Sequence, residues 1–362
     1  MTTSEFDSLR PPEPAGRRRG GKRRRPGSTP SGDGSREMSM VPDAEFTSYY
    51  GRPVVKPPPW GEEIPAYLFL GGLAGGSGLL AAGAQFTGRN LLRRNSRLAA
   101  IAAIGLGSVA LVRDLGRPER FLNMLRTVKV TSPMSIGSWI LALYSAGAGV
   151  TAAIEVDRLT GSRFPLGPLR RLLPVVDVGA GLWAAAFAPP LAAYTAVLLA
   201  DTANPTWNAA RDELPFVFVS SAALASGGLA MITTPVDEAG PARTLAVIGA
   251  AVETAATKLL HRNMDPTVAE TLHHGQAGKL LKWSEALTIA GGVGALFAGR
   301  HRAVAVVSGV TLLAASALTR FGIFEAGIHS AKDPKYTIEP QKRRLAARRA
   351  AGITDDSITT AG

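Results

Sequence analysis

Long apolar stretches separated by short polar segments make up most of the chain after residue 63. A helix needs about 20 residues to cross the hydrocarbon core of a bilayer. The stretches that reach or approach this length are residues 64–86, 98–112, 133–156, 175–200, 214–233, 244–260, 280–298 and 303–321. The second, sixth and seventh are short or contain polar residues. This pattern predicts an all-α integral membrane protein with about eight transmembrane helices.

Small residues recur along these stretches at intervals that allow close helix packing. Gly71 and Gly75, and likewise Gly72 and Gly76, form two overlapping small-xxx-small pairs in the first stretch. In a lipid environment, close backbone approach contributes more to helix association than apolar burial does. We therefore expect residues 48–330 to fold as a compact eight-helix domain built from two four-helix bundles.

Composition excludes several kinds of redox centre. Of the 362 residues, 46% are hydrophobic and only 19% are charged, which is unlike a water-soluble domain. The chain contains no cysteine, so it cannot ligate an iron–sulfur cluster through thiolates or form a disulfide. Its five histidines lie at the ends of the predicted helices or between them. We therefore expect no haem, no iron–sulfur cluster and no metal site in this chain.

The net charge of +12 is unevenly distributed. Residues 1–47 combine arginine clusters with many Pro, Gly and Ser residues, and no apolar run follows that a cleavable signal would need. We expect this segment, and the basic segment 331–362, to be disordered tails. Lipid head groups explain these tails more simply than nucleic acid does. An even number of crossings and the cytoplasmic bias of Lys and Arg predict a multi-pass cell membrane protein with both termini cytoplasmic.

The start of the first apolar stretch carries candidate chemistry. Glu63 and Tyr67 are four residues apart, which places them on one face of a helix. A carboxylate and a phenol can hydrogen-bond a carbonyl or hydroxyl oxygen and exchange a proton with it. Tyr194 lies on a stripe of aromatic residues in the fourth stretch. A flat ring with two oxygens, such as a quinone, suits this combination, while solvated charges at a helix start are the alternative interpretation.

Two features inside the predicted helices require explanation. Pro189 and Pro190 remove two backbone donors near the middle of the fourth stretch and predict a broken helix there. Glu253 lies in the middle of the sixth stretch, where an ionised carboxylate costs at least about 2.5 kcal/mol. We expect Glu253 to be protonated or paired with Lys258.

Three further acidic residues lie nearer the ends of their stretches. They are Glu155 in the third stretch, Asp177 in the fourth and Glu285 in the seventh. A structural salt bridge, or a carboxylate whose side chain reaches the membrane interface, is the simplest interpretation at these positions.

Several segments, in this order, give the chain a family resemblance. They are Ile64-Pro65-Ala66-Tyr67-Leu68-Phe69, Asp114-Leu115-Gly116-Arg117-Pro118, Ser132-Pro133-Met134-Ser135, Tyr194-Thr195, Pro205-Thr206-Trp207, and Arg320 with Ala326-Gly327. A further match is Tyr49-Tyr50-Gly51-Arg52-Pro53. Over residues 48–344 the chain resembles the membrane subunits of polysulfide-reductase-type complexes, the NrfD/PsrC type.

The resemblance implies a function in electron transfer. Such subunits exchange electrons between the menaquinone pool and a docked four-cluster, ferredoxin-like iron–sulfur subunit, next to a molybdopterin catalytic subunit. They have no redox group of their own, so this chain alone would not act on the terminal substrate. Proton movement could accompany the electron transfer. A secondary transporter and a purely structural membrane anchor remain alternative functions.

The resemblance also implies roles for individual residues. The quinone pocket of the family carries over to Glu63, Tyr67 and Tyr194. In the mechanism that follows, Glu63 transfers protons at the pocket, and Glu253, noted above for its position inside a helix, belongs to an internal proton-transfer route. Asp114 and Arg117 would hold the loop beside the pocket or dock the partner subunit. Some relatives have an amide and a histidine where this chain has Ile64 and Tyr67, so the quinone contacts are expected to differ.

Overall fold

The computed structural model describes residues 53–352, which belong to a unit that begins at Pro53. Within these residues the chain is helical and has no strand. The expected tail at residues 1–47, the motif that begins at Tyr49 and the last ten residues lie outside the described part or at its edge.

Eight long helices make up most of the described part of the chain. They are α1 (Glu63–Phe86), α2 (Asn90–Asp114), α3 (Pro133–Leu159), α4 (Leu173–Ala200), α6 (Leu214–Thr233), α7 (Gly240–Asn263), α9 (Gly275–Phe297) and α10 (Arg302–Lys332). The shorter helices are η2 (Pro118–Leu125), η3 (Gly167–Leu172), α5 (Pro205–Ala209), α8 (Pro266–His273) and α11 (Lys335–Ala350).

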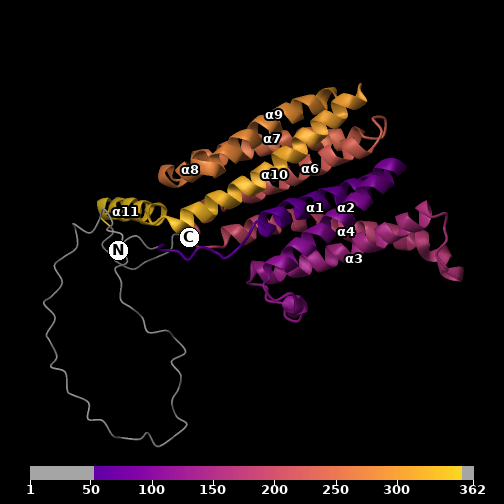
Figure 1. Cartoon of the computed structure of the whole chain (residues 1–362), viewed down its shortest axis with the longest axis horizontal. Coiled ribbons are helices and arrows are strands. Elements are labelled where there is room, and N and C mark those ends of the chain that lie inside the picture. The colour runs from indigo at the N-terminus through magenta and orange to yellow at the C-terminus, as the bar shows by residue number, and fades with distance from the viewer. Residues whose placement is uncertain (1–52, 353–362) are drawn as a thin grey trace, which may run out of the picture. The chain divides into compact units, whose positions relative to one another are not determined.

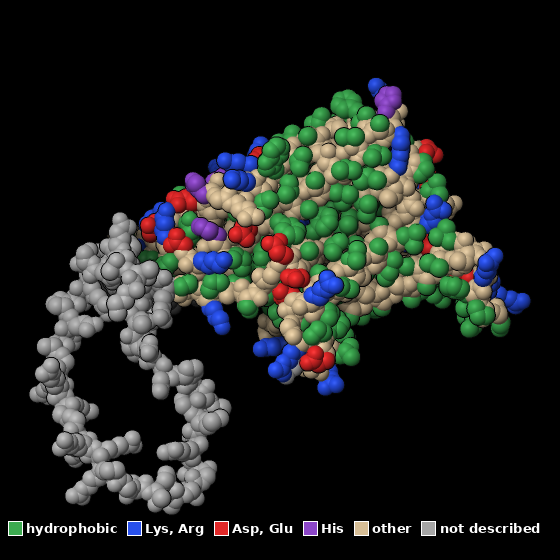
Figure 2. All heavy atoms as spheres, in the orientation of Figure 1, with side chains coloured by type: hydrophobic (Ala, Val, Ile, Leu, Met, Phe, Trp, Pro, Cys, Tyr) green, Lys and Arg blue, Asp and Glu red, His purple; other side chains and the backbone are tan. Residues whose placement is uncertain are grey.

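Six of these eight helices have the length and hydropathy needed to cross a membrane. They are α1, α2, α3, α4, α6 and α10. Apolar side chains cover the middle of the visible face, and charged side chains gather toward the helix ends (Figure 2). The chain is therefore a multi-pass membrane protein. Helices α7 and α9 do not meet the same standard, so eight crossings stay a prediction.

Helix α1 occupies a central position among the long helices (Figure 1). It packs against α2 and α4 on one side and against α6 on the other. Helix α3 packs against α4, while α6, α7, α9 and α10 pack against one another in the pairs α6–α7, α6–α10, α7–α9 and α9–α10. These contacts give a first group, α1–α4, and a second group, α6, α7, α9 and α10. A division into two separate bundles stays a prediction, because α1 and α4 also contact α6.

The glycines of α1 explain its central position. A side chain at Gly72 or Gly76 would meet Ala222 or Ser226 of α6, so both glycines face that helix. Gly75 faces α4, where an added Cβ atom would lie 2.8 Å from the carbonyl oxygen of Ala188. The small residues thus allow the backbone of α1 to approach two neighbours closely.

The predicted break in the fourth stretch is wrong. Helix α4 continues through Pro189 and Pro190 to Ala200. Proline has a φ angle compatible with a helix, so each proline removes its own N–H bond without requiring the chain to leave the helix. The close packing of α1 beside Ala188 supports the helix at this point.

The expectation of a disordered C-terminal tail is wrong for residues 335–350, which form α11. Two ion pairs attach α11 to α8 and the residue before it. Lys335 Nζ lies 2.7 Å from a carboxylate oxygen of Glu270, and Arg343 lies 2.7 Å from a carboxylate oxygen of Asp265. The hydrogen bond from Lys335 holds the pKa of the Glu270 carboxyl below its ordinary value. These contacts, with the buried ring of Tyr336, give the basic segment a fixed partner that composition alone did not reveal.

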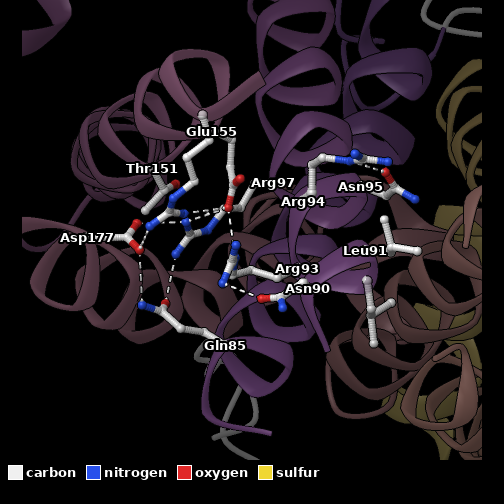
Figure 3. Close-up of polar contacts among 12 residues, drawn as sticks. Gln85, Asn90, Leu91, Arg93, Arg94, Asn95, Arg97, Thr151, Glu155 and Asp177 are labelled. Atoms are coloured by element: carbon white, nitrogen blue, oxygen red, sulfur yellow. Dashed lines mark hydrogen bonds and ion pairs between the residues drawn. The ribbon is translucent and has the colours of Figure 1, made fainter. Parts of the chain in front are cut away.

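A buried network of charges joins α1 to α4 at the end of the first group where α1 ends and α2 begins (Figure 3). Arg97 donates to Glu155 at 2.9 Å and to Asp177 at 2.7 Å, and these three side chains are almost completely buried. Gln85 accepts from Arg97 at 2.8 Å, and Arg158 donates to both carboxylates. The prediction of structural salt bridges at Glu155 and Asp177 is confirmed.

Candidate functional site

Two tyrosine side chains from different helices meet near the start of α1. The hydroxyl of Tyr67 on α1 forms a hydrogen bond with the hydroxyl of Tyr194 on α4. Tyr67 is buried and Tyr194 is half-buried. Gly137 of α3 provides the space for this arrangement, because an added Cβ atom there would meet the ring of Tyr194. Gly107 of α2 lies against the ring of Tyr67 in the same way.

Glu63 lies one turn before Tyr67, in the first turn of α1, and is half-buried. The backbone N–H of Gly61 donates to the carboxylate of Asp114 at 3.1 Å, which joins the segment before α1 to the end of α2. An added Cβ atom at Gly61 would also meet the carboxylate of Glu63. Glu63 and Asp114 are therefore close neighbours, whereas Arg117 is exposed in the loop after α2.

A row of aromatic rings continues from this place into the second group of helices. The Trp60 ring stacks on Trp207 with ring centroids 5.9 Å apart, and Trp207 packs against Phe324 of α10 at 5.6 Å. Trp207 is fully buried, and its indole N–H donates to the carbonyl of Ile323 at 2.8 Å. Gly327 leaves room for its ring. Trp207 thus connects the start of α1 with the interior of the second group.

Glu253 lies apart from the tyrosine pair, on α7. It is almost completely buried and accepts a hydrogen bond from the hydroxyl of Thr319 at 2.7 Å. Its second carboxylate oxygen has no hydrogen-bond partner. The cation that acts on it electrostatically is Arg320 of α10, and the expected pairing with Lys258 is wrong, since Lys258 is exposed.

A cavity of about 190 Å³ opens beside Glu253. Helices α5 to α10 contribute to its wall, and its lining includes Trp207, six hydroxyl side chains and several ionisable side chains. The hydroxyl-bearing residues are Thr206, Thr254, Thr257, Ser284, Thr288 and Thr319. The ionisable residues are Glu253, His261, His273, Lys282 and Glu285.

The structure therefore brings some of the sequence-predicted residues together and separates others. Tyr67, Tyr194, Glu63 and Asp114 gather around the first turns of α1, while Glu253 belongs to a second polar region. Sequence reasoning missed the contact between His261 and His273, whose ring centroids are 4.8 Å apart. The spacing of four residues from Glu253 to Thr257 and to His261 was the available signal for the second region.

Comparison with known proteins adds family information. Residues 54–240, just over half of the chain, match the family described as polysulphide reductase, NrfD. The matched region includes the tyrosine pair, Glu63 and Asp114, and it ends where α7 begins. Glu253 and most of the cavity lining lie beyond it. No curated protein matches the chain.

Proposed function

The chain belongs to the polysulphide reductase NrfD family, and on that premise we propose that it binds menaquinone or menaquinol beside Tyr67 and Tyr194. Members of this family are quinone-associated membrane subunits of molybdopterin and iron–sulfur oxidoreductase complexes. In our proposal the chain exchanges electrons between the membrane quinone pool and a docked four-cluster iron–sulfur subunit. The molybdopterin subunit acts on the terminal substrate.

The observation that carries this proposal is the hydroxyl-to-hydroxyl contact of Tyr67 and Tyr194. These residues are 127 positions apart, so the fold and not local sequence brings them together. Phenol hydroxyls both donate and accept hydrogen bonds, which suits a ring oxygen in either its carbonyl or its hydroxyl form. The donor set of two phenols with a carboxylate one turn away therefore fits the ring of a quinone.

The chain's own residues would orient the ring and move its protons. A quinol supplies two electrons and two protons when it is oxidised. Tyr67 and Tyr194 would exchange their mutual hydrogen bond for bonds to a ring oxygen, and a hydroxyl that takes a proton from that oxygen would pass its own proton on toward Glu63 or water, or the reverse. Glu63, which is half-buried in the first turn of α1, exchanges that proton with water. Asp114 acts on the site by holding Gly61, and thereby the segment that leads to Glu63.

Partner docking follows from the position of the site. Electron transfer requires the nearest cluster to approach the ring closely, so we place the iron–sulfur subunit at the end of the molecule where α1 begins. Arg117, exposed in the loop after α2, lies at this end and is available to contact that subunit. We place this protein in the cell membrane with both termini cytoplasmic, as the basic tails suggest.

The substitution Gly137→Ala tests the site without changing a phenol. The added methyl group would meet the ring of Tyr194 and displace it from Tyr67. We expect Gly137→Ala to lower quinol-dependent turnover of the assembled complex by roughly tenfold or more, because small misplacements of catalytic groups reduce rates strongly. Turnover is measured with a soluble quinol analogue at saturating terminal substrate.

Gly149→Ala is the matched control on the same helix, since an added Cβ atom there meets nothing within 4 Å. It should leave turnover unchanged. Equal turnover of both variants and the unmodified complex would favour the structural-anchor function instead.

A further inference from the structure

The cavity in the second group of helices has no role in the proposed quinone site. We propose that it is a water-filled proton channel that leads from the ends of α7 and α8 to Glu253. Its purpose, proton exchange during quinone turnover, rests on the proposed function, but the channel itself is a property of the helices that line it.

Two facing helices direct polar side chains into the cavity along its length. On α7, Glu253, Thr257 and His261 recur at intervals of four residues and therefore form one stripe. On α9, Glu285 and Thr288 lie three residues apart on the stripe that faces them. A polar stripe that faced hydrocarbon would be unfavourable, because unpaired polar groups are costly there. The two stripes are therefore expected to face water.

The deep end of the cavity holds an incompletely satisfied carboxyl group. One oxygen of Glu253 accepts from Thr319, whose hydroxyl lies 2.6 Å from the hydroxyl of Ser284. The other oxygen makes no hydrogen bond in this geometry, although the Ser221 hydroxyl is close enough to act on the carboxyl and the residue is only 3% exposed. Buried polar groups are almost always hydrogen-bonded, to water where protein partners are lacking. The cavity beside Glu253 is large enough for several ordered waters.

Arg320 limits how far the channel extends. One guanidinium nitrogen of Arg320 donates to the carbonyl of Phe218 at 2.5 Å, and its guanidinium carbon lies 3.7 Å from the centroid of the Phe218 ring. The same guanidinium packs against Gly72 of α1. Arg320 therefore stands between Glu253 and the helix that carries Tyr67, and its positive charge opposes the passage of a proton beyond Glu253.

Ionisable side chains surround the opening of the cavity. The rings of His261 and His273 lie in edge contact, and Lys282 and Glu285 of α9 are exposed beside them. These four groups, with Glu253 and Arg320 inside, are the titratable residues that face the route. Histidines are the side chains most suited to take up and release protons near neutral pH.

Proton movement along this route changes no net bond. A proton leaves water or a histidine at the rim, and each O–H bond that breaks along the chain of waters and hydroxyls is replaced by the next that forms. Glu253 holds the proton at the deep end and returns it by the reverse sequence. No oxidant or reductant takes part.

The absence of cysteine from the chain allows a direct test of hydration. Single variants Ser284→Cys and Thr257→Cys place a thiol on the cavity wall, and Ser138→Cys places one in the buried interior of α3, away from the cavity. Full-length protein in lipid vesicles is treated with a charged, membrane-impermeant methanethiosulfonate and, separately, with a lipid-soluble maleimide. We expect the charged reagent to modify both cavity thiols at least roughly tenfold faster than Ser138→Cys, because the reactive thiolate forms in water and not in a dry interior.

Ser138 lies nearer to the end of its helix than Ser284 does, so depth along the helix alone would favour modification of the control thiol. Modification of the cavity thiols by the lipid-soluble reagent alone would overturn the proposal and indicate a lipid-filled pocket. If both reagents modified the two cavity thiols as slowly as Ser138→Cys, the cavity would be dry, and the proposal would also be overturned. The comparison of the charged with the lipid-soluble reagent at the two cavity thiols needs no quinone and no electron transfer, so its result is independent of whether the quinone site is correct.

Discussion

Replacement of Tyr194 or Tyr67 by phenylalanine is expected to lower quinol-dependent electron transfer of the assembled complex by roughly 10²-fold, the lower range for loss of a general acid–base group. Each substitution removes one hydroxyl and keeps the ring, so the packing against Gly137 and Gly107 is preserved. Steady-state turnover with a quinol analogue measures the effect. Electron transfer within the partner subunits, driven by an artificial donor, should stay unchanged.

The double variant sharpens this prediction. Tyr67 and Tyr194 share one hydrogen bond and should act as a unit. The double variant should therefore lose about as much turnover as either single variant, and not the product of the two single losses. Tyr144→Phe is the matched control: this phenol is fully buried in the same group of helices but donates to the carbonyl of Ala74. Full turnover in Tyr67→Phe and Tyr194→Phe, or an equal loss in Tyr144→Phe, would contradict the proposed site.

The second large effect is expected at Arg97. Substitution by methionine keeps an unbranched apolar side chain but removes the buried guanidinium between Glu155 and Asp177, which leaves these carboxylates only the more exposed Arg93 and Arg158 as partners. Removing one partner from a buried ion pair costs roughly 3–5 kcal/mol. We expect Arg97→Met to lower the free energy of unfolding by this amount, measured by denaturant unfolding in detergent with circular dichroism.

Arg94→Met is the control for this experiment, since Arg94 lies one turn earlier and donates to the neighbouring Asn95 at 3.3 Å. It should change stability by less than about 1 kcal/mol, as is usual for solvated polar contacts. Restoration of stability in a triple variant that also carries Glu155→Gln and Asp177→Asn would show that the cost arises from unpaired charge. Equal stability of Arg97→Met and the unmodified protein would show that the network contributes nothing.

Much of the fold was predictable because the bilayer restricts what a chain can do. Backbone groups in hydrocarbon must be satisfied within helices, so the lengths of the apolar stretches indicate the helices directly. Of the three stretches that were expected to be the weakest, 98–112 corresponds to α2, which is apolar enough to cross a membrane, whereas 244–260 and 280–298 correspond to α7 and α9, which are not among the candidate membrane spans. Polar residues such as Glu253 and Ser284 weakened that signal, and the structure gives them a cavity to face.

The errors have physical causes as well. Lys258 follows Glu253 by five residues, which places the two side chains about 140° apart around a helix and prevents the expected pairing. Helix α11 depends on ion pairs to Asp265 and Glu270, which are distant in sequence and leave no mark in local composition. The meeting of Trp60 with Trp207 likewise depends on how α5 is placed against α10.

The candidate site was partly predictable. Glu63 and Tyr67 follow from helical spacing, and Tyr194 follows from the aromatic stripe of the fourth stretch together with the family resemblance. Spacing alone could not show that Tyr194 points at Tyr67, because the contact depends on close approach of α3 and α4 at Gly137.

Binding of a menaquinone analogue to the purified full-length chain in lipid nanodiscs tests the central claim most directly. Titration followed by quenching of tryptophan fluorescence should give saturable binding with one site per chain. Affinity should fall in Tyr67→Phe and in Tyr194→Phe but not in Tyr144→Phe. Absence of saturable binding, or binding that the three substitutions leave equally strong, would contradict a quinone site beside the tyrosine pair.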